Sequence, residues 1–192
     1  MTDQRLERAL ARFDELNAAD PTLLEGRPRE LLSAERLSAW VYRVEPDPSE
    51  ALRLASRCHH LMRWKVKRGE FPEGRAGYHA WRRHMAEFHA DLAAEVLREV
   101  GYDETSIGDV RRIVLKQGMQ SRADVQHMED ALCLSFLEHE LADFAGGQPE
   151  DKLLEILRQT WRKMSPRGQA LARELLPGLP DDVRALVARA LG

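Results

Sequence analysis

Apolar residues recur at intervals of three and four along almost the whole chain, and no stretch alternates apolar and polar residues for long. This spacing lines one face of an α-helix, whereas a half-buried strand requires alternation. Proline and glycine interrupt the periodic stretches at 46–48, 146–149, 166–168 and 177–180. These residues end helices, so the pattern predicts an all-α fold in a single helical bundle.

The interruptions divide the chain into expected helices. They cover about 3–18, 30–45, 50–64, 78–100, 103–117 and 124–145, followed by two or three shorter ones near the C-terminal end. Because some of these segments are short, we expect a bundle of about seven to nine helices. Ser49 is the expected N-cap of the third helix, and 65–77 is an expected loop. The sixth helix is apolar on nearly every side, which predicts that it is central and buried. No stretch is typical of a linker, so we expect one domain over 1–192.

Composition limits where such a chain can function. The chain has no apolar run near the roughly 18 residues that span a bilayer, and its first residues lack the apolar core of a signal peptide. Its two cysteines, Cys58 and Cys133, form no CxxC motif and lie within apolar helical patterns. They are typical of small buried side chains in a reducing compartment. We therefore expect a cytoplasmic protein without a membrane partner.

Charge is distributed unevenly. The residues from Arg53 to Arg83, called the basic segment below, contain nine Lys or Arg residues and only two acids, a net charge of +7. The formal net charge of the whole chain is −3, so the remainder carries −10. Such asymmetry predicts an anionic partner, most simply one that bears phosphate. The alternative is a solvated basic loop that acidic neighbours balance.

The centre of the basic segment offers groups suited to a phosphate ligand. Arg63, Lys65 and Arg68 can neutralise phosphate, and Trp64 can stack on a base or sugar. No glycine-rich phosphate-binding loop precedes a helix here. The expected ligand is an anionic small molecule or a nucleotide, and nucleic acid is the alternative.

Helical-wheel positions identify candidate buried polar groups. His89 falls within the apolar stripe of the fourth expected helix, and Glu129 and Asp130 are adjacent acids on the all-apolar sixth. A buried imidazole or carboxylate needs a hydrogen bond, an opposite charge or a metal. His89 is therefore either a core histidine with a hydrogen-bond partner or a metal ligand. Glu129 and Asp130 are likewise either members of buried ion pairs or metal ligands. His59 lies near the edge of the third helix's apolar stripe and His60 lies further round, close to Arg63, and both stand at the start of the basic loop.

Several motifs together resemble domain-of-unknown-function family 4202, an uncharacterised bacterial family. They are Ala34–Trp40, Ala55–Trp64, Gly77–Arg82, Phe88–Ala90, Glu129–Asp130 and Thr160–Ser165. The resemblance spans nearly the whole chain. It implies the order and placement of these motifs and carries no established activity.

The chain also resembles, more distantly, the HD-type metal-dependent phosphohydrolases. In that superfamily a His-Asp pair, a later histidine and a closing acid hold the metal, and the matching order here is His60, His89, then Glu129 or Asp130. The residue after His60 is Leu61, where the superfamily has aspartate. The wheel favours His59 as the ligand of this pair, and the resemblance favours His60.

The resemblance implies an HD-like bundle and a hydrolase of a phosphate ester or nucleotide. A divalent metal (iron, manganese, zinc or cobalt) would be bound by His59 or His60, His89 and Glu129 or Asp130, and would activate water. The two acids are its candidate catalytic residues. The alternative is a non-catalytic helical module that binds RNA, a nucleotide or an acidic partner through the basic segment. The sequence does not determine the substrate, the metal or the oligomeric state.

Overall fold

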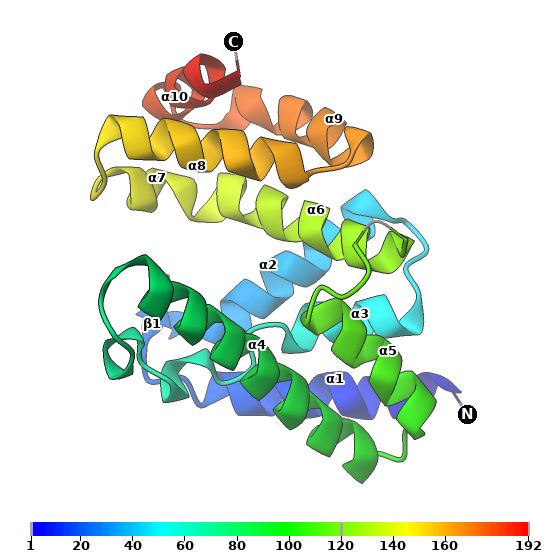
Figure 1. The fold of residues 1–192 in the computed structure, drawn as a ribbon. Coiled ribbons are helices and arrows are strands. Elements are labelled where there is room, and N and C mark those ends of the chain that lie inside the picture. Colours follow the sequence, from blue (N-terminus) through cyan, green and yellow to red (C-terminus); the bar gives the residue numbers. More distant parts are fainter. Residues whose placement is uncertain (1, 120, 192) are drawn as a thin grey trace.

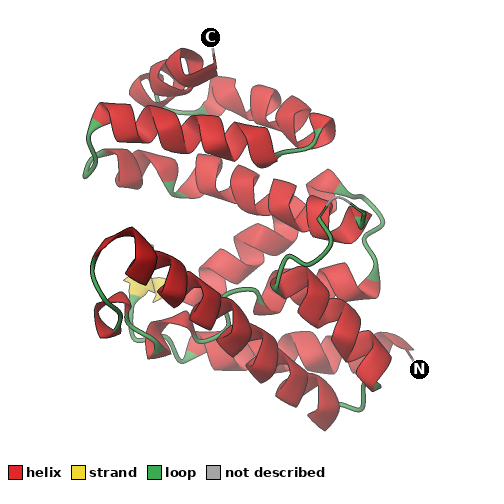
Figure 2. Cartoon of the chain, viewed as in Figure 1, coloured by secondary structure: helices red, strands yellow, loops and turns green. Residues whose placement is uncertain are grey.

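The computed structural model describes residues 2–119 and 121–191, and helices account for most of these residues (Figure 2). The α-helices in the described ranges are α1 (Thr2–Ala18), α2 (Arg29–Val44), α3 (Glu50–Cys58), α4 (Gly74–Glu99), α5 (Glu104–Val114), α6 (Ala123–His139), α7 (Leu141–Ala145), α8 (Glu150–Lys163), α9 (Pro166–Leu175) and α10 (Asp181–Leu191). Three 3₁₀ turns accompany them: η1 (Arg63–Lys65), η2 (Arg68–Glu70) and η3 (Leu176–Gly178). The all-α prediction is confirmed, with ten α-helices where seven to nine were expected.

The helices pack into one body in which α2 joins two layers (Figure 1). The helices α1, α3, α4 and α5 form the lower part of the view, and α6 to α10 are stacked above them towards the C-terminus. Between the two parts runs α2, which packs on α6, α3 and α1. Residues from both halves of the chain therefore meet at α2, α3 and α6.

The core lies where these helices meet. Phe13, Trp40 and Leu134 are among its largest fully buried side chains. The prediction that the sixth helix is buried is confirmed by Met128 and Leu134 of α6, neither of which is exposed. Cys58 and Cys133 are free and buried, as expected from the sequence.

The third helix is shorter than predicted, because α3 ends at Cys58 instead of continuing to about residue 64. The backbone of Met62 is left-handed, with φ = 52°, which a helix cannot accommodate. Long-range contacts compensate for the break: Leu61 is fully buried, and the Met62 amide donates to the Asn17 side chain at 3.1 Å. No proline or glycine marks this position, so the sequence alone could not indicate it.

Two other boundaries also differ from the prediction. The sixth expected helix is divided at Glu140 into α6 and α7, and the turn places Leu141 in the core with no exposed surface. The longest helix, α4, begins at Gly74 instead of at 78. Its first turns pack so closely against the loop that a side chain at Gly77 would collide with the Pro72 carbonyl.

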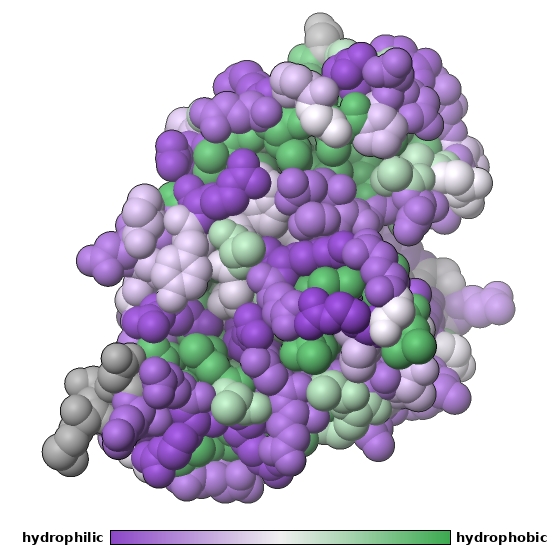
Figure 3. Space-filling view, turned by 180° about the vertical axis from the view of Figure 1, so that it is seen from behind, coloured by the Kyte–Doolittle hydropathy of each residue, from purple (hydrophilic) through white to green (hydrophobic). Residues whose placement is uncertain are grey.

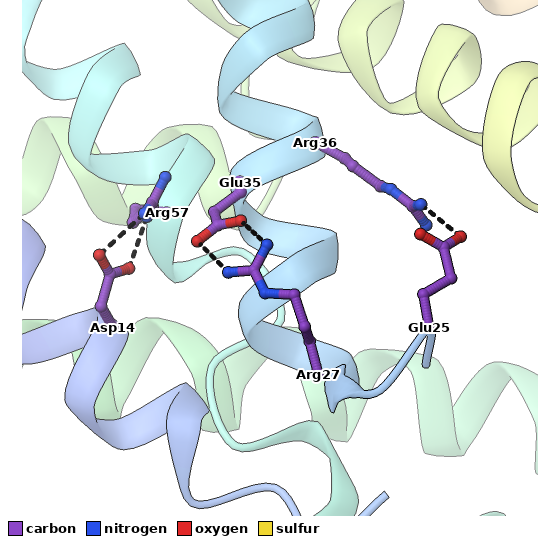
Figure 4. Close-up of polar contacts among 6 residues, drawn as sticks. All are labelled: Asp14, Glu25, Arg27, Glu35, Arg36 and Arg57. Carbon is purple, nitrogen blue, oxygen red and sulfur yellow. Dashed lines mark hydrogen bonds and ion pairs between the residues drawn. The ribbon is translucent and has the colours of Figure 1, made fainter. Parts of the chain in front are cut away.

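A two-residue hairpin precedes α2, although no strand was predicted. The strands β1 (Leu23–Leu24) and β2 (Arg27–Pro28) are joined by Glu25 and Gly26, which both have positive φ. Two ion pairs attach the hairpin to α2 (Figure 4): Arg27 makes a two-pronged contact with Glu35, and Arg36 donates to Glu25 at 2.6 Å. Strands this short carry no recognisable alternation, which explains why the pattern missed them.

Hydrophilic side chains cover most of the rear face, with apolar residues showing between them, for example over the C-terminal helices (Figure 3). None of the described helices combines the length and apolar character needed to cross a bilayer.

Candidate anion-binding site

Three histidines from two separate parts of the chain meet at the end of α3. His59 and His60 follow its last turn, and His89 lies on α4. The ring centroids are 4.9 Å apart for His59 and His60, and 5.9 Å apart for His60 and His89. His59 and His89 are buried, which confirms the prediction for His89 and places His59 deeper than the wheel suggested. We call these three residues the histidine cluster.

The environment of the histidine cluster favours neutral imidazoles. Burial lowers the pKa of His89 to about 4. Burial likewise lowers the pKa of His59 and of His60 well below the usual value, and the nearby charges of Lys116 and Arg63 add to this effect. All three rings are therefore uncharged near neutral pH.

Hydrogen bonds fix the proton positions on two of these rings. His89 Nδ1 lies 2.8 Å from the Leu61 carbonyl, which can only accept, so Nδ1 carries the proton and Nε2 keeps its lone pair. His60 Nε2 lies 3.4 Å from the Arg63 guanidinium, which can only donate, so its proton resides on Nδ1. His59 Nδ1 is buried without a hydrogen-bond partner among the described residues.

Arg63 is the cation that adjoins this cluster. It belongs to η1, is half-buried and lies over the Trp81 ring at 5.5 Å from the ring centroid. Within the described part of the chain it forms no ion pair with a carboxylate. Arg63 directly follows Met62, whose backbone is left-handed. The backbone of Lys116, whose charge acts on His59, is also left-handed, with φ = 56°. Such conformations carry a cost, and they concentrate at functional sites.

The same lack of partners extends along the basic segment. Of its nine cations, only Arg57 forms an ion pair among the described residues, with Asp14 of α1 at 2.5 and 2.8 Å (Figure 4). Arginines elsewhere are commonly paired, as Arg98 is with Glu104 and Arg111 is with Asp91. The acidic neighbours that would have balanced the basic segment are therefore not in contact with its other cations.

The predicted phosphate-binding residues differ in their surroundings. Lys65 is exposed, and Trp64 is half-buried beside it in η1. Arg68 donates to the carbonyls of Phe71 and Gly74, at 3.0 and 3.4 Å, and so holds the loop before α4. Arg63 and Lys65 thus keep their charges available to a ligand, whereas Arg68 has a structural role as well.

Both predicted acids are buried, and each already has partners. Glu129 accepts from Lys116 Nζ at 2.5 Å and lies 3.8 Å from Lys163 Nζ. Asp130 accepts from the Ser165 amide at 2.8 Å, from the Ser165 hydroxyl and from Gln126. Ser165 is the N-cap of α9, so Asp130 fixes the start of that helix.

The structure brings the histidines together but does not assemble all five predicted ligands into one cluster. Across the described ranges, no group of three or more His, Cys, Asp or Glu side chains is arranged to hold a metal ion. The lysine partners of Glu129 and the hydroxyl and amide partners of Asp130 occupy the carboxylates. Metal binding therefore stays a prediction.

Sequence reasoning did not identify Glu30 as a site residue. Glu30 is buried in the first turn of α2, and burial raises its pKa to about 7, with the Arg63 charge as the main opposing influence. A signal was present: Glu30 precedes Ala34, Leu37 and Val41 by four, seven and eleven residues, which places it on the apolar stripe.

A small pocket of about 40 Å³ has His60 in its wall. Its walls come from α2, α3 and α6 and include the polar side chains of Ser33, Ser56 and Ser135. His60 therefore belongs both to the histidine cluster and to the wall of this pocket. Nothing in the helical patterns had singled out these serines, which come from three separate helices.

A family model described as "Domain of unknown function (DUF4202)" matches residues 7–187. The chain belongs to this family. The DUF4202 match includes every motif on which the sequence resemblance rested, and it covers α2 to α9 completely. No curated protein and no solved structure matches the chain. The description of the DUF4202 family states no activity, so a functional assignment depends on the site itself.

Proposed function

We propose that this DUF4202 protein binds a phosphate-bearing anion at the basic segment beside the histidine cluster. The observation that supports this proposal is the position of Arg63. A half-buried guanidinium with no carboxylate partner among the described residues has lost part of its hydration without an ion pair to replace it. A phosphate would supply the missing charge and accept more than one of its hydrogen bonds.

The neighbours of Arg63 support the same ligand. The imidazoles are neutral, so they add no positive charge that would repel Arg63 or compete with it for an anion. The proton of His60 lies on Nδ1, which has no hydrogen-bond partner within the described residues. Lys65 and Lys67 follow on exposed positions and extend the positive potential beyond the site.

Calorimetric titration with inorganic pyrophosphate tests this proposal. We expect wild-type protein to bind and Arg63→Gln to bind at least about tenfold more weakly, since a hydrogen bond to a charged group is worth roughly 1.5–3 kcal/mol. Arg158→Gln is the matched control, because Arg158 is an exposed arginine of α8 outside the basic segment. Equal affinity in all three proteins, or no binding to wild type, contradicts the proposal.

The second candidate function is the metal-dependent phosphohydrolase with an HD-like bundle. One observation favours it: His59, His60 and His89 are adjacent and neutral, and the Leu61 carbonyl orients His89 with Nε2 unprotonated. As the side chains stand, Glu129 would have to leave Lys116 to join them. Asp130 would have to leave Ser165.

Metal content by elemental analysis separates the two candidates. Protein purified without a histidine tag would be compared with His89→Ala and with Glu129→Ala/Asp130→Ala. Near-stoichiometric metal that is lost from both variants supports the hydrolase. Wild-type protein that stays metal-free after incubation with manganese or iron excludes it and leaves anion binding as the function.

A further inference from the structure

An aromatic pair lies beside the unpaired cations, on the first turns of α4. Tyr78 and Trp81 have ring centroids 6.0 Å apart, and Tyr78, at 42% exposed, is among the exposed large hydrophobic residues of the described structure. Trp81 is half-buried and donates from Nε1 to the Val66 carbonyl at 3.4 Å, which fixes its ring against the loop. The two rings therefore form a supported aromatic surface.

Each ring of this pair is accompanied by an arginine. The Arg63 guanidinium lies 5.5 Å from the Trp81 ring centroid, and the Arg82 guanidinium lies 5.9 Å from that of Tyr78. Neither arginine is in an ion pair with a described carboxylate. Solvent-accessible aromatic rings next to unpaired cations can bind bases by stacking and phosphates by charge.

The extent of this surface favours a polymer over a mononucleotide. Its cations come from η1, from η2 and from α4, where Arg75 and Arg82 are two turns apart, about 10 Å along the helix axis. A nucleoside monophosphate carries one phosphate group and could engage only some of these cations. A chain of phosphates can follow it, and its bases can meet Tyr78 and Trp81.

The aromatic pair also favours unpaired bases. Bases in a duplex are stacked on one another, and their faces are closed to a side chain, whereas single strands expose them. An acidic peptide would match the charge, but it would gain little from an exposed tyrosine ring.

We infer that the basic segment binds single-stranded nucleic acid, with bases stacked on Tyr78 and Trp81 and phosphates on Arg63, Arg82 and their neighbours. This inference rests on the proposed anion-binding function and names its ligand. It adds Tyr78, Trp81 and Arg82 to the binding residues and assigns the stacking role to this pair instead of to Trp64.

Fluorescence anisotropy with a labelled, unstructured oligouridine tests the inference, with the same-length DNA strand and an RNA duplex as competitors. Tyr78→Leu removes an exposed ring and keeps an apolar side chain. Tyr42→Leu is its matched control, because Tyr42 is also exposed (46%) but lies on α2, outside the basic segment. Circular dichroism confirms that each variant is folded.

We expect Tyr78→Leu and Trp81→Leu each to weaken oligouridine binding by about tenfold, with Tyr42→Leu unchanged. Single-stranded competitors should displace the probe better than the duplex, and the affinity should fall steeply with added salt. Equal weakening by Tyr42→Leu, no effect of Tyr78→Leu, or stronger displacement by the duplex overturns the inference. If pyrophosphate binds and oligouridine does not, the inference fails while the proposed function stands.

Discussion

At the scale of single residues, Asp130 shows how a buried carboxylate can serve the fold. It has no exposed surface, and its oxygens accept from Ser165 and Gln126. Gly168 leaves room for it, because a side chain there would come within 2.6 Å of the Asp130 carboxyl carbon. The start of α9 therefore depends on this one side chain of α6.

Asp130→Ala should lower the free energy of unfolding by about 3 kcal/mol, since it removes three hydrogen bonds and leaves the Ser165 amide unpaired in a partly buried position. Urea denaturation measures the change. Asp143→Ala is the control, because Asp143 is exposed on α7, and it should shift stability by no more than about 0.5 kcal/mol. Equal effects of the two substitutions would show that Asp130 does not hold α9.

Glu30 should make stability fall as the pH rises from about 4.5 to 7. Its pKa in the folded protein is raised to about 7, so across this range the folded state binds a proton that the unfolded state has released. The loss attributable to this group is about 3 kcal/mol, complete above pH 7.

Glu30→Gln removes this titration. The free energy of unfolding of the variant, relative to wild type, should therefore increase across the same pH range. Denaturation at several pH values provides the comparison. The buried histidines change stability with pH in the opposite direction to Glu30, but they do so equally in both proteins, so their effect cancels in the difference. A difference that does not change with pH would contradict the assignment.

Much of this residue-scale picture could be predicted. The burial of His89, and of at least one of Glu129 and Asp130, followed from apolar neighbours on the same helix. Their partners could not be predicted, because Leu61, Lys116 and Ser165 come from other elements, and only the packed structure sets those distances.

At the scale of elements, the basic segment depends on how its loop packs against α4. Gly77 is buried, and the Pro72 carbonyl occupies the space that a side chain would need. This close approach positions η1 and η2 against the turns that carry Tyr78 and Trp81. A single methyl group at Gly77 should therefore disturb the whole surface.

Gly77→Ala should destabilise the protein by about 2 kcal/mol, because the loop or the helix must shift to admit the methyl group. Gly69→Ala is the control: it adds a methyl group to the same segment, at a position with ordinary φ and open space. It should be neutral or slightly stabilising. Thermal unfolding of both variants measures the difference, and equal midpoints would argue against close packing at Gly77.

The helices were largely predictable because their apolar period and their caps are local properties. The N-cap Ser49 is one example: its side chain accepts from the Leu52 amide as expected. The end of α3 was not predictable, because the contacts that stabilise the turn after it come from packing: Leu61 is buried in the core, and the Met62 amide donates to Asn17 of α1. That unpredicted turn is also the feature that brings the histidine cluster and Arg63 together.

At the scale of the whole molecule, positive charge is concentrated at one end of α4. Arg75, Arg82 and Arg83 lie on its first turns, whereas Glu87 and Asp91 on later turns contact Arg111 of α5. These two acids are thus engaged away from the basic segment, and the charge imbalance seen in the sequence persists in the fold. The imbalance was predictable from composition; the lack of ion pairs around it required the structure.

Backbone-amide NMR during titration with pyrophosphate tests the central claim most directly, because it locates an anion without assuming which residues bind it. The account predicts that the largest shift changes fall in η1, η2 and the first turns of α4, and that they disappear in Arg63→Gln. Shift changes confined to α6–α10, or equal changes in Arg63→Gln, would contradict it.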